Sequence, residues 1–283
     1  VCQNIANNKD NPKDMIDNHE FIKLLFITIS EGVTEMNQTA RQNALLVCQN
    51  LSFPSDTRAK LLQAMEGKFF EALISTADNL VNSLNATAAE KAMAVIANMA
   101  NKKENNLPMV QNSKFLSMAI RYARSQDGEL KRHAINILAK IAAGSLETAP
   151  ALLASEEESA LEVMMGVVRT AGTDLKKWKK GNSNEFWALT FLMNLSQAPY
   201  AGPHMIKAGV FELIEPFVSQ TSKECLQAGI TVVYLISADK TKEEQIKTLL
   251  SKNTPTLDRI VALLENTLNG EGDGKGKTGN NIE

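Results

Sequence analysis

The sequence is poor in cysteine, in aromatic residues and, before its last stretch, in glycine. Its 283 residues include three cysteines, Cys2, Cys48 and Cys225, an odd number at wide spacing that forms neither a disulfide framework nor a CxxC pair. Aromatic residues make up 5% of the chain, and five of the 15 glycines fall within residues 270–279, which argues against a glycine-rich turn fold. The cysteine usage predicts a reducing, intracellular location, most simply the cytoplasm.

An excess of charge of one sign is also lacking, and so are long hydrophobic runs. The 30 Lys and Arg residues against 32 Asp and Glu residues leave a net charge of -2, which removes the usual electrostatic reason to expect nucleic-acid binding. The longest apolar stretches, such as residues 21–29, fall well short of the ~18 residues that span a bilayer. Nucleic acids and membranes are therefore not expected as partners.

Motifs of catalysis and metal binding are missing from the sequence as well. The histidines His19, His133 and His204 stand alone, without an HExxH motif or His/Cys ligand spacing, and we interpret them as surface or helix-end residues. The Gly-Lys-Thr run at 276–278 lacks the first glycine and the flanking strand and helix of a phosphate-binding loop. We expect a non-catalytic protein with no cofactor, no metal ion and no small-molecule substrate.

What the sequence does contain is an internal repeat. The segment Val-Cys-Gln-Asn at residues 1–4 returns at residues 47–50, and similar anchors follow at spacings of 46, 48, 42, 54 and 41 residues. The anchor positions are Asn4, Asn50, Asn98, Lys140, Asn194 and Leu235. Six residues before each complete anchor stands a small residue: Ala44, Ala92, Ala134, Ala188 and Gly229. Apolar residues follow one and four positions later, which is the pattern of a buried helix face.

Polar residues mark where these helices are expected to begin. One lies eleven residues before each of three anchors: Thr39, Thr87 and Ser183. The first two are followed three residues later by Gln42 and Glu90, as in a capping box. Between anchors, residues 57–66 and 68–80 show the apolar spacing of two more amphipathic helices, and strand-type alternation is absent.

A unit of 41 to 54 residues with about three helices, the last ending in Asn-Leu-Ser or Asn-Met-Ala, resembles the armadillo repeat, with the HEAT repeat as a close neighbour. The resemblance covers residues 1–268 and implies an all-α, right-handed superhelix whose third helices line a concave groove. Residues 269–283 are rich in Gly, Lys and Asn and are predicted to be disordered. Because the array starts and ends within incomplete repeats, we expect the chain to be a fragment of a longer protein.

The resemblance implies a row of amides along the groove that contact an extended peptide backbone: Asn50, Asn98 and Asn194. In importin-α-type members such asparagines partner tryptophans one helical turn earlier. Those positions here hold Leu46, Ala94 and Thr190, so recognition of nuclear localisation signals is not expected. A second interpretation stays open, in which the amides bond to groups of the neighbouring repeat.

Two basic features interrupt this neutral pattern. Arg132, Asn136 and Lys140 recur at four-residue spacing on one helix, where they receive an acidic partner segment or simply form a solvated face. The 54-residue spacing contains an insertion with a basic run, either a surface for phosphate groups or a loop that its tryptophan pins to the array. This run consists of Lys176, Lys177, Trp178, Lys179 and Lys180.

The sequence therefore predicts a protein-interaction scaffold that binds a protein or an extended peptide segment in its concave groove. Two alternatives remain open. One is a structural subunit of a large assembly that uses its convex face or its loops. The other is a nucleic-acid or membrane adaptor that uses residues 176–180. Myosin-binding chaperones of the armadillo type also have irregular repeats, but no residue pattern selects them.

Overall fold

The computed structural model of the chain describes residues 11–31, 37–79, 83–144, 146–154, 159–170, 183–198, 200–210 and 212–214. The basic run at 176–180, the anchors at 4 and 235 and the tail at 269–283 lie outside the described residues. All the regular elements in the described part are helices, and none of those helices has the length and apolar character that crossing a membrane requires.

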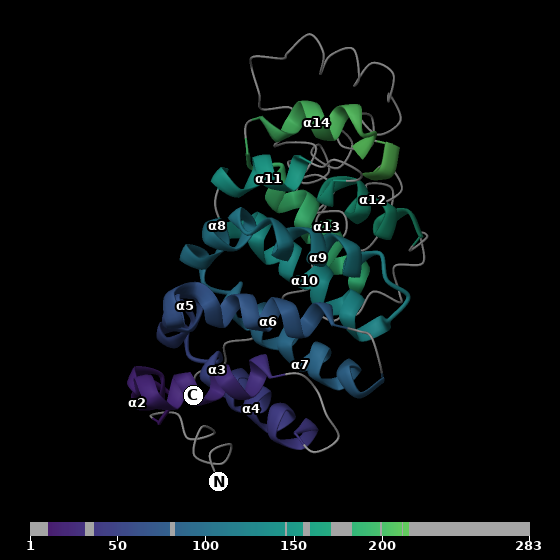
Figure 1. The fold of residues 1–283 in the computed structure, drawn as a ribbon. Coiled ribbons are helices and arrows are strands. Elements are labelled where there is room, and N and C mark those ends of the chain that lie inside the picture. The colour runs from purple at the N-terminus through teal and green to yellow at the C-terminus, as the bar shows by residue number, and fades with distance from the viewer. Residues whose placement is uncertain are drawn as a thin grey trace, which may run out of the picture.

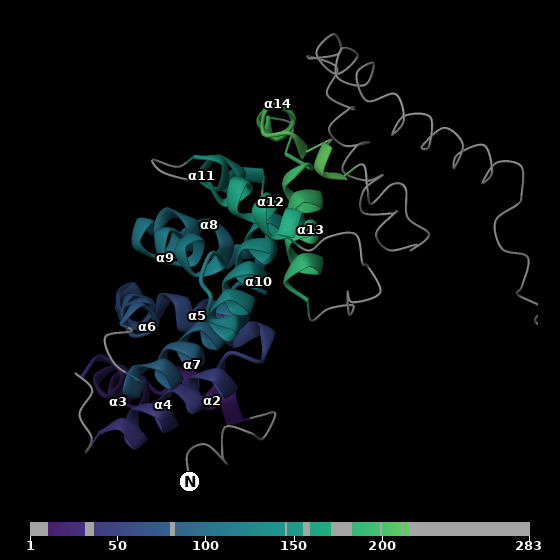
Figure 2. The ribbon, with the colours of Figure 1, turned by 90° about the vertical axis from the view of Figure 1, so that its right-hand side faces the viewer.

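The helices stack in three columns, which Figures 1 and 2 show from two sides. The first column contains α2 (Asn11–Asp17), α5 (Ser55–Gln63), α8 (Lys103–Gln111) and α11 (Ala149–Leu153), and α14 (Ala201–Lys207) follows α11. The second contains α3 (His19–Ser30), α6 (Lys68–Asp78), α9 (Ser113–Ala123) and α12 (Ala160–Thr170). The third contains α4 (Gln38–Leu51), α7 (Ser83–Met99), α10 (Gly128–Gly144) and α13 (Asn184–Leu195). Two 3-10 helices, η1 (Ala64–Gly67) and η2 (Leu146–Thr148), lie in the connections.

The third column confirms the repeat read from the sequence. Each of its helices carries one anchor, at residue 50, 98, 140 or 194, within its last two turns. The small residues Ala92, Ala134 and Ala188 are fully buried, and Ala44 is 6% exposed. The apolar residues one and four positions after each of them belong to one continuous core. The described part of the chain is thus an all-α armadillo-type solenoid, in which neighbouring repeats share their apolar faces.

Hydrogen bonds connect equivalent places in successive repeats. The Tyr122 hydroxyl donates to the Ala77 carbonyl at 2.8 Å, across 45 residues of sequence. The Asn105 side-chain amide donates to the Arg58 carbonyl at 3.2 Å, across 47 residues. Because these separations match the repeat length, each bond fixes one repeat on the next, and the contacts that hold the array are local in the sense of a solenoid.

The capping-box predictions at Thr39 and Thr87 are wrong. Helix α4 begins at Gln38 and helix α7 at Ser83, so both threonines lie inside helices. The Ser/Thr-x-x-Glu/Gln pattern occurs inside helices as well as at helix starts, since the same residues are tolerated on an exposed helix face. Glu90 is consequently an exposed residue of the second turn of α7 rather than a capping partner.

The start predicted at Ser183 is confirmed, because its hydroxyl accepts a bond from the Phe186 amide at 3.1 Å. A capping box also exists at the start of α12, where the Glu162 amide donates to the Ser159 hydroxyl at 3.2 Å. The Glu162 carboxylate accepts from the Ser159 amide in return at 2.8 Å. Both devices satisfy amide groups that the first turn of a helix leaves without partners.

The helices expected at 57–66 and 68–80 correspond to α5 and α6, but the first ends earlier. A left-handed turn separates the two helices, with φ of 54° at Met65, 59° at Glu66 and 84° at Gly67. Helical spacing of apolar residues continues through this turn, so the pattern alone placed the end of α5 too late. The turn redirects the chain from the first column to the second.

Candidate functional site

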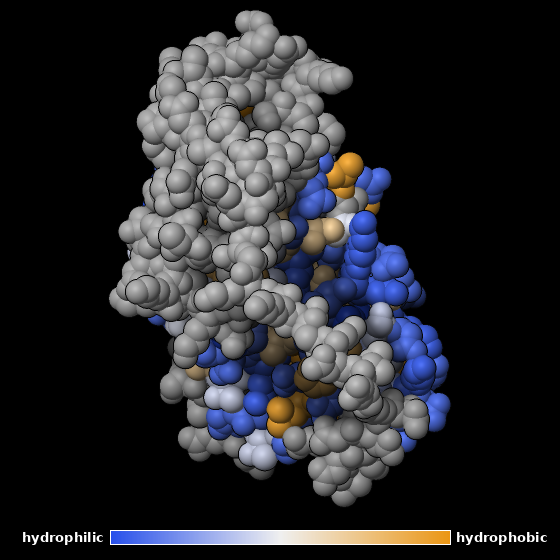
Figure 3. Space-filling view, turned by 180° about the vertical axis from the view of Figure 1, so that it is seen from behind, coloured by the Kyte–Doolittle hydropathy of each residue, from blue (hydrophilic) through white to orange (hydrophobic). Residues whose placement is uncertain are grey.

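A hollow of about 200 Å³ lies on the side of the third column that faces away from the first and second columns. Figure 3 shows the molecule from this side, where the described side chains are mostly hydrophilic with scattered apolar patches. Among the residues that the structure describes, the lining comes from third-column helices: Gln49 of α4, Ala94, Ala97 and Asn98 of α7, Arg132, His133, Asn136 and Lys140 of α10, and Trp187 of α13. It therefore extends along the face that the armadillo resemblance assigns to the groove.

The lining residues occupy the same positions in successive repeats. Asn98 and Lys140 are anchors, and Asn136 lies four residues before an anchor. His133 and Trp187 both lie seven residues before an anchor. Offsets of four and seven residues fall on one face of an α-helix. The hollow is thus lined by the same face of successive third helices.

The anchor amides bond to the preceding repeat. The Asn98 side-chain amide donates to the Ser52 hydroxyl at 2.9 Å, and the Asn194 amide donates to the Ala139 carbonyl at 3.1 Å. These bonds agree with the interpretation that the amides satisfy groups of the neighbouring repeat. Replacing either asparagine by alanine is therefore expected to cost about 0.5 to 1.5 kcal/mol of stability.

Lys140 stands at an anchor position and makes the same kind of bond as an anchor asparagine. Its ammonium donates to the Ala97 carbonyl at 3.0 Å. Ala97 precedes the anchor of the repeat before, as Ala139 does for the bond of Asn194. The lysine thus keeps the inter-repeat bond and adds a positive charge to the row of anchor residues.

The charge of Lys140 is poorly compensated. Burial, together with repulsion from Arg58, lowers the pKa of its ammonium from 10.5 to about 8. Among the described residues, its one hydrogen bond is to a carbonyl, and no carboxylate forms an ion pair with it. Arg132, in contrast, is held by Glu129, whose carboxylate accepts from its Nε at 3.1 Å.

His133 is half-buried in the second turn of α10, so its interpretation as a surface or helix-end residue is wrong. Burial, followed by the charge of Arg132, lowers the pKa of the imidazole from 6.5 to about 4. The ring is therefore neutral at neutral pH. One ring nitrogen, Nε2, lies 3.4 Å from the guanidinium of Arg132.

The structure brings four of the predicted site residues together in the hollow: Asn98, Arg132, Asn136 and Lys140. Asn50 is half-buried near the end of α4, but the residue of that helix that lines the hollow is Gln49. Asn194 lies on α13, where the lining residue is Trp187. Sequence reasoning missed Gln49, His133 and Trp187 as lining residues, although the seven-residue offset shared by the last two was a usable signal.

A larger depression of about 910 Å³ lies on the second column between α6 and α9. Its charged residues include both signs, and Arg121 forms an ion pair with Asp78 there. Because opposite charges already meet at this depression, it has less to gain from a charged ligand than the hollow at Lys140 has. We therefore take the third-column hollow as the candidate site.

No protein-family model matches the chain, and neither does any curated protein. Among solved structures, it is similar to an engineered protein, with 18% sequence identity, a TM-score of 0.66 and coverage of 84% of this chain and 88% of that chain. It is also similar to a designed armadillo repeat protein in complex with the peptide (KR)4, with 16% identity, a TM-score of 0.65 and coverage of 83% and 90%. Computationally designed armadillo repeat proteins for modular peptide recognition give 17% identity and a TM-score of 0.65.

Proposed function

From its armadillo-like repeat fold, we propose that the protein is a non-catalytic scaffold that binds an extended protein segment along its third-column helices. An acidic side chain of that segment enters the hollow beside Lys140. The observation that carries this proposal is the partly buried ammonium of Lys140, which has a carbonyl partner and no carboxylate among the described residues.

The physical reason is the cost of burying a charge. An ammonium removed from water loses hydration, and a single carbonyl returns only part of that energy. A carboxylate or phosphate group placed in the hollow restores a full countercharge to Lys140. Asn136 and the guanidinium of Arg132 line the same hollow and supply further hydrogen-bond donors for an anion.

The anchor asparagines add contacts to the backbone of the segment. A side-chain amide has two N–H groups and one oxygen, so the bond of Asn98 to Ser52 leaves it the capacity for others. The designed protein with a similar fold is in complex with a basic peptide, (KR)4. The positive hollow described here predicts the opposite preference for this chain, since like charges disfavour association.

Binding of labelled peptides tests the proposal. We expect an extended (Ser-Glu)4 peptide to bind at least about tenfold more tightly than (Ser-Lys)4, measured by fluorescence anisotropy at physiological salt. Lys140→Met is expected to weaken (Ser-Glu)4 binding by about tenfold or more, because a charge-assisted hydrogen bond contributes about 1.5 to 3 kcal/mol.

Lys131→Met is the matched control. It removes the same charge from the same helix, but residue 131 does not line the hollow. Equal affinities for the two peptides, tighter binding of (Ser-Lys)4, or equal losses in both lysine variants would contradict the proposal. Circular dichroism melts of each variant verify that the array is folded.

A further inference from the structure

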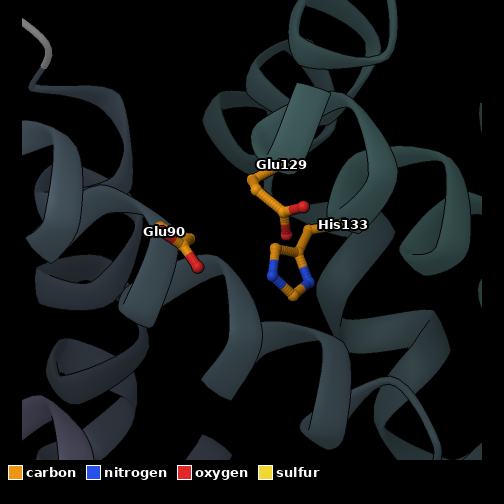
Figure 4. A group of neighbouring side chains, drawn as sticks. All are labelled: Glu90, Glu129 and His133. Carbon is orange, nitrogen blue, oxygen red and sulfur yellow. The ribbon is translucent and has the colours of Figure 1, made fainter. Parts of the chain in front are cut away.

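Three side chains with metal-ligand chemistry meet at the edge of the hollow. Figure 4 shows Glu90 on α7 and Glu129 and His133 on α10, with their polar ends pointing toward one another. One ligand atom from each residue can be chosen such that all three lie within 4.8 Å of one another. We propose that Glu90, Glu129 and His133 form a site for a divalent transition-metal ion that joins two successive repeats.

The backbone holds the three residues in a suitable arrangement. Glu129 and His133 are four residues apart on α10, so they share one helix face. Glu90 comes from the neighbouring helix of the third column, which packs against α10. In a tetrahedral zinc site the ligand atoms lie about 3.4 Å apart, so small rotations of the two exposed glutamates close the site around an ion.

The donor set favours a transition metal over calcium or magnesium. One imidazole nitrogen and two carboxylate oxygens match the His and Glu ligands of zinc sites that keep an open position for water. Calcium and magnesium prefer sets made entirely of oxygen, with six or more ligands. His133 is half-buried on α10, which limits the orientations open to its ring and holds the imidazole near the two carboxylates.

A neighbouring cation competes with the ion. The guanidinium of Arg132 bonds to Oε2 of Glu129 and lies 3.4 Å from Nε2 of His133. A metal ion must displace this guanidinium or coordinate the other atoms of the two side chains. Removing the guanidinium should therefore strengthen metal binding, an effect that nonspecific binding to surface carboxylates does not predict.

No motif of the sequence indicates this site, and the proposal departs from the expectation of a protein without a metal ion. His133 has no cysteine or second histidine at ligand spacing, and Glu90 lies 43 residues earlier in the chain. The two helices must pack in register before the three residues meet. The metal site shares Arg132 and His133 with the hollow of the proposed function, but its ligands Glu90 and Glu129 do not line that hollow and Lys140 is not part of it. Zn²⁺ binding and peptide binding can therefore fail separately.

Calorimetric titration of the metal-free full chain with ZnCl2 tests the site. We expect one Zn²⁺ per chain and a higher melting temperature in its presence, because an ion that binds only the folded state stabilises it. Loss of residues that merely support ligands weakens metal binding by about 10- to 100-fold, so His133→Ala and Glu90→Gln should each weaken it by at least about tenfold. Arg132→Gln should tighten it about two- to fivefold, the scale of an exposed ion pair.

His204→Ala is the matched control, because His204 is an exposed histidine on α14. Zn²⁺ binding that survives His133→Ala, or that His204→Ala reduces equally, overturns the site. So does Mg²⁺ that displaces Zn²⁺ at comparable concentration. The Glu90→Gln variant keeps the test valid if His133→Ala unfolds, because Glu90 is exposed on α7.

Discussion

Gly144→Ala is expected to lower the free energy of unfolding by about 3 kcal/mol, through overpacking and a damaged buried hydrogen bond. Gly144 is the last residue of α10, at its contact with α8. A β-carbon at this position would stand 2.6 Å from Cγ of Asn106. Asn106 is 1% exposed, and its amide donates to the Lys140 carbonyl at 3.1 Å.

Asn106 has no simple way to move aside. It is enclosed by the core, and its Oδ1 is buried without a hydrogen-bond partner among the described residues. Any shift that clears the new methyl group weakens the bond to Lys140, which lies one helical turn before Gly144. The two helices must then separate, and the shared core between two repeats loses contacts.

Urea denaturation followed by circular dichroism measures the effect, with Gly166→Ala as the matched control. Gly166 lies inside α12, and a β-carbon there meets no atom within 4 Å. That substitution is expected to stabilise the protein by about 0.5 to 1 kcal/mol, because alanine loses less conformational freedom in a helix than glycine. Equal effects of the two substitutions would show that the packing of α8 against α10 is not as tight as described.

Lys140→Met is expected to raise stability at neutral pH by about 2 kcal/mol and to flatten the rise of stability with pH between 8 and 10.5. The ammonium has a pKa of about 8 in the folded chain and 10.5 as its ordinary value. Between these two values the unfolded chain carries a proton that the folded chain has lost, so stability increases with pH. Below pH 8 both states are charged, and the full cost of burying the charge is present.

Urea denaturation at pH 7, 8.5 and 10 checks this result, as a difference between wild type and variant that cancels the titration of other groups. The gap between pKa 10.5 and about 8 corresponds to on the order of 3 kcal/mol, and the partial exposure of Lys140 reduces this to about 2 kcal/mol. Lys131→Met serves again as the control. If both variants show the wild-type pH dependence, the protein already compensates the charge of Lys140, and an acidic ligand is no longer expected at the hollow.

The third helices could be predicted from the sequence because their constraint is repeated. Each must place a small residue where two helices approach, and apolar residues one and four positions later, whatever the rest of the repeat contains. Ala92 and Met93, or Ala134 and Ile135, satisfy this with different residues and are all fully buried. A core requirement that recurs four times stands out from variation at single positions.

Helix starts could be predicted less well, because a helix can begin with or without a side-chain cap. Helix α10 begins after Asp127, whose carboxylate accepts bonds from the Glu129 and Leu130 amides. Helix α4 begins after Asn37, with no side-chain bond at its cap. The cost of losing a cap is about 1 kcal/mol, which tertiary packing readily outweighs.

The site was predictable only in part, for a related reason. Arg132, Asn136 and Lys140 lie on one helix, so their spacing reveals that they share a face. Gln49 and Trp187 reach the same hollow from other repeats. Their contribution depends on how far successive repeats are rotated, which no single helix encodes.

The bond from Lys140 to the Ala97 carbonyl separates the two tasks of an anchor residue. Lys140 donates to the carbonyl of Ala97, the residue before the preceding anchor, as Asn194 donates to the carbonyl of Ala139. The charge of the anchor side chain, by contrast, differs between repeats, since Lys140 is positive and Asn98 and Asn194 are neutral. If the proposed function holds, exchange between asparagine and lysine at an anchor changes the charge that the protein presents to a ligand and keeps a bond between neighbouring repeats.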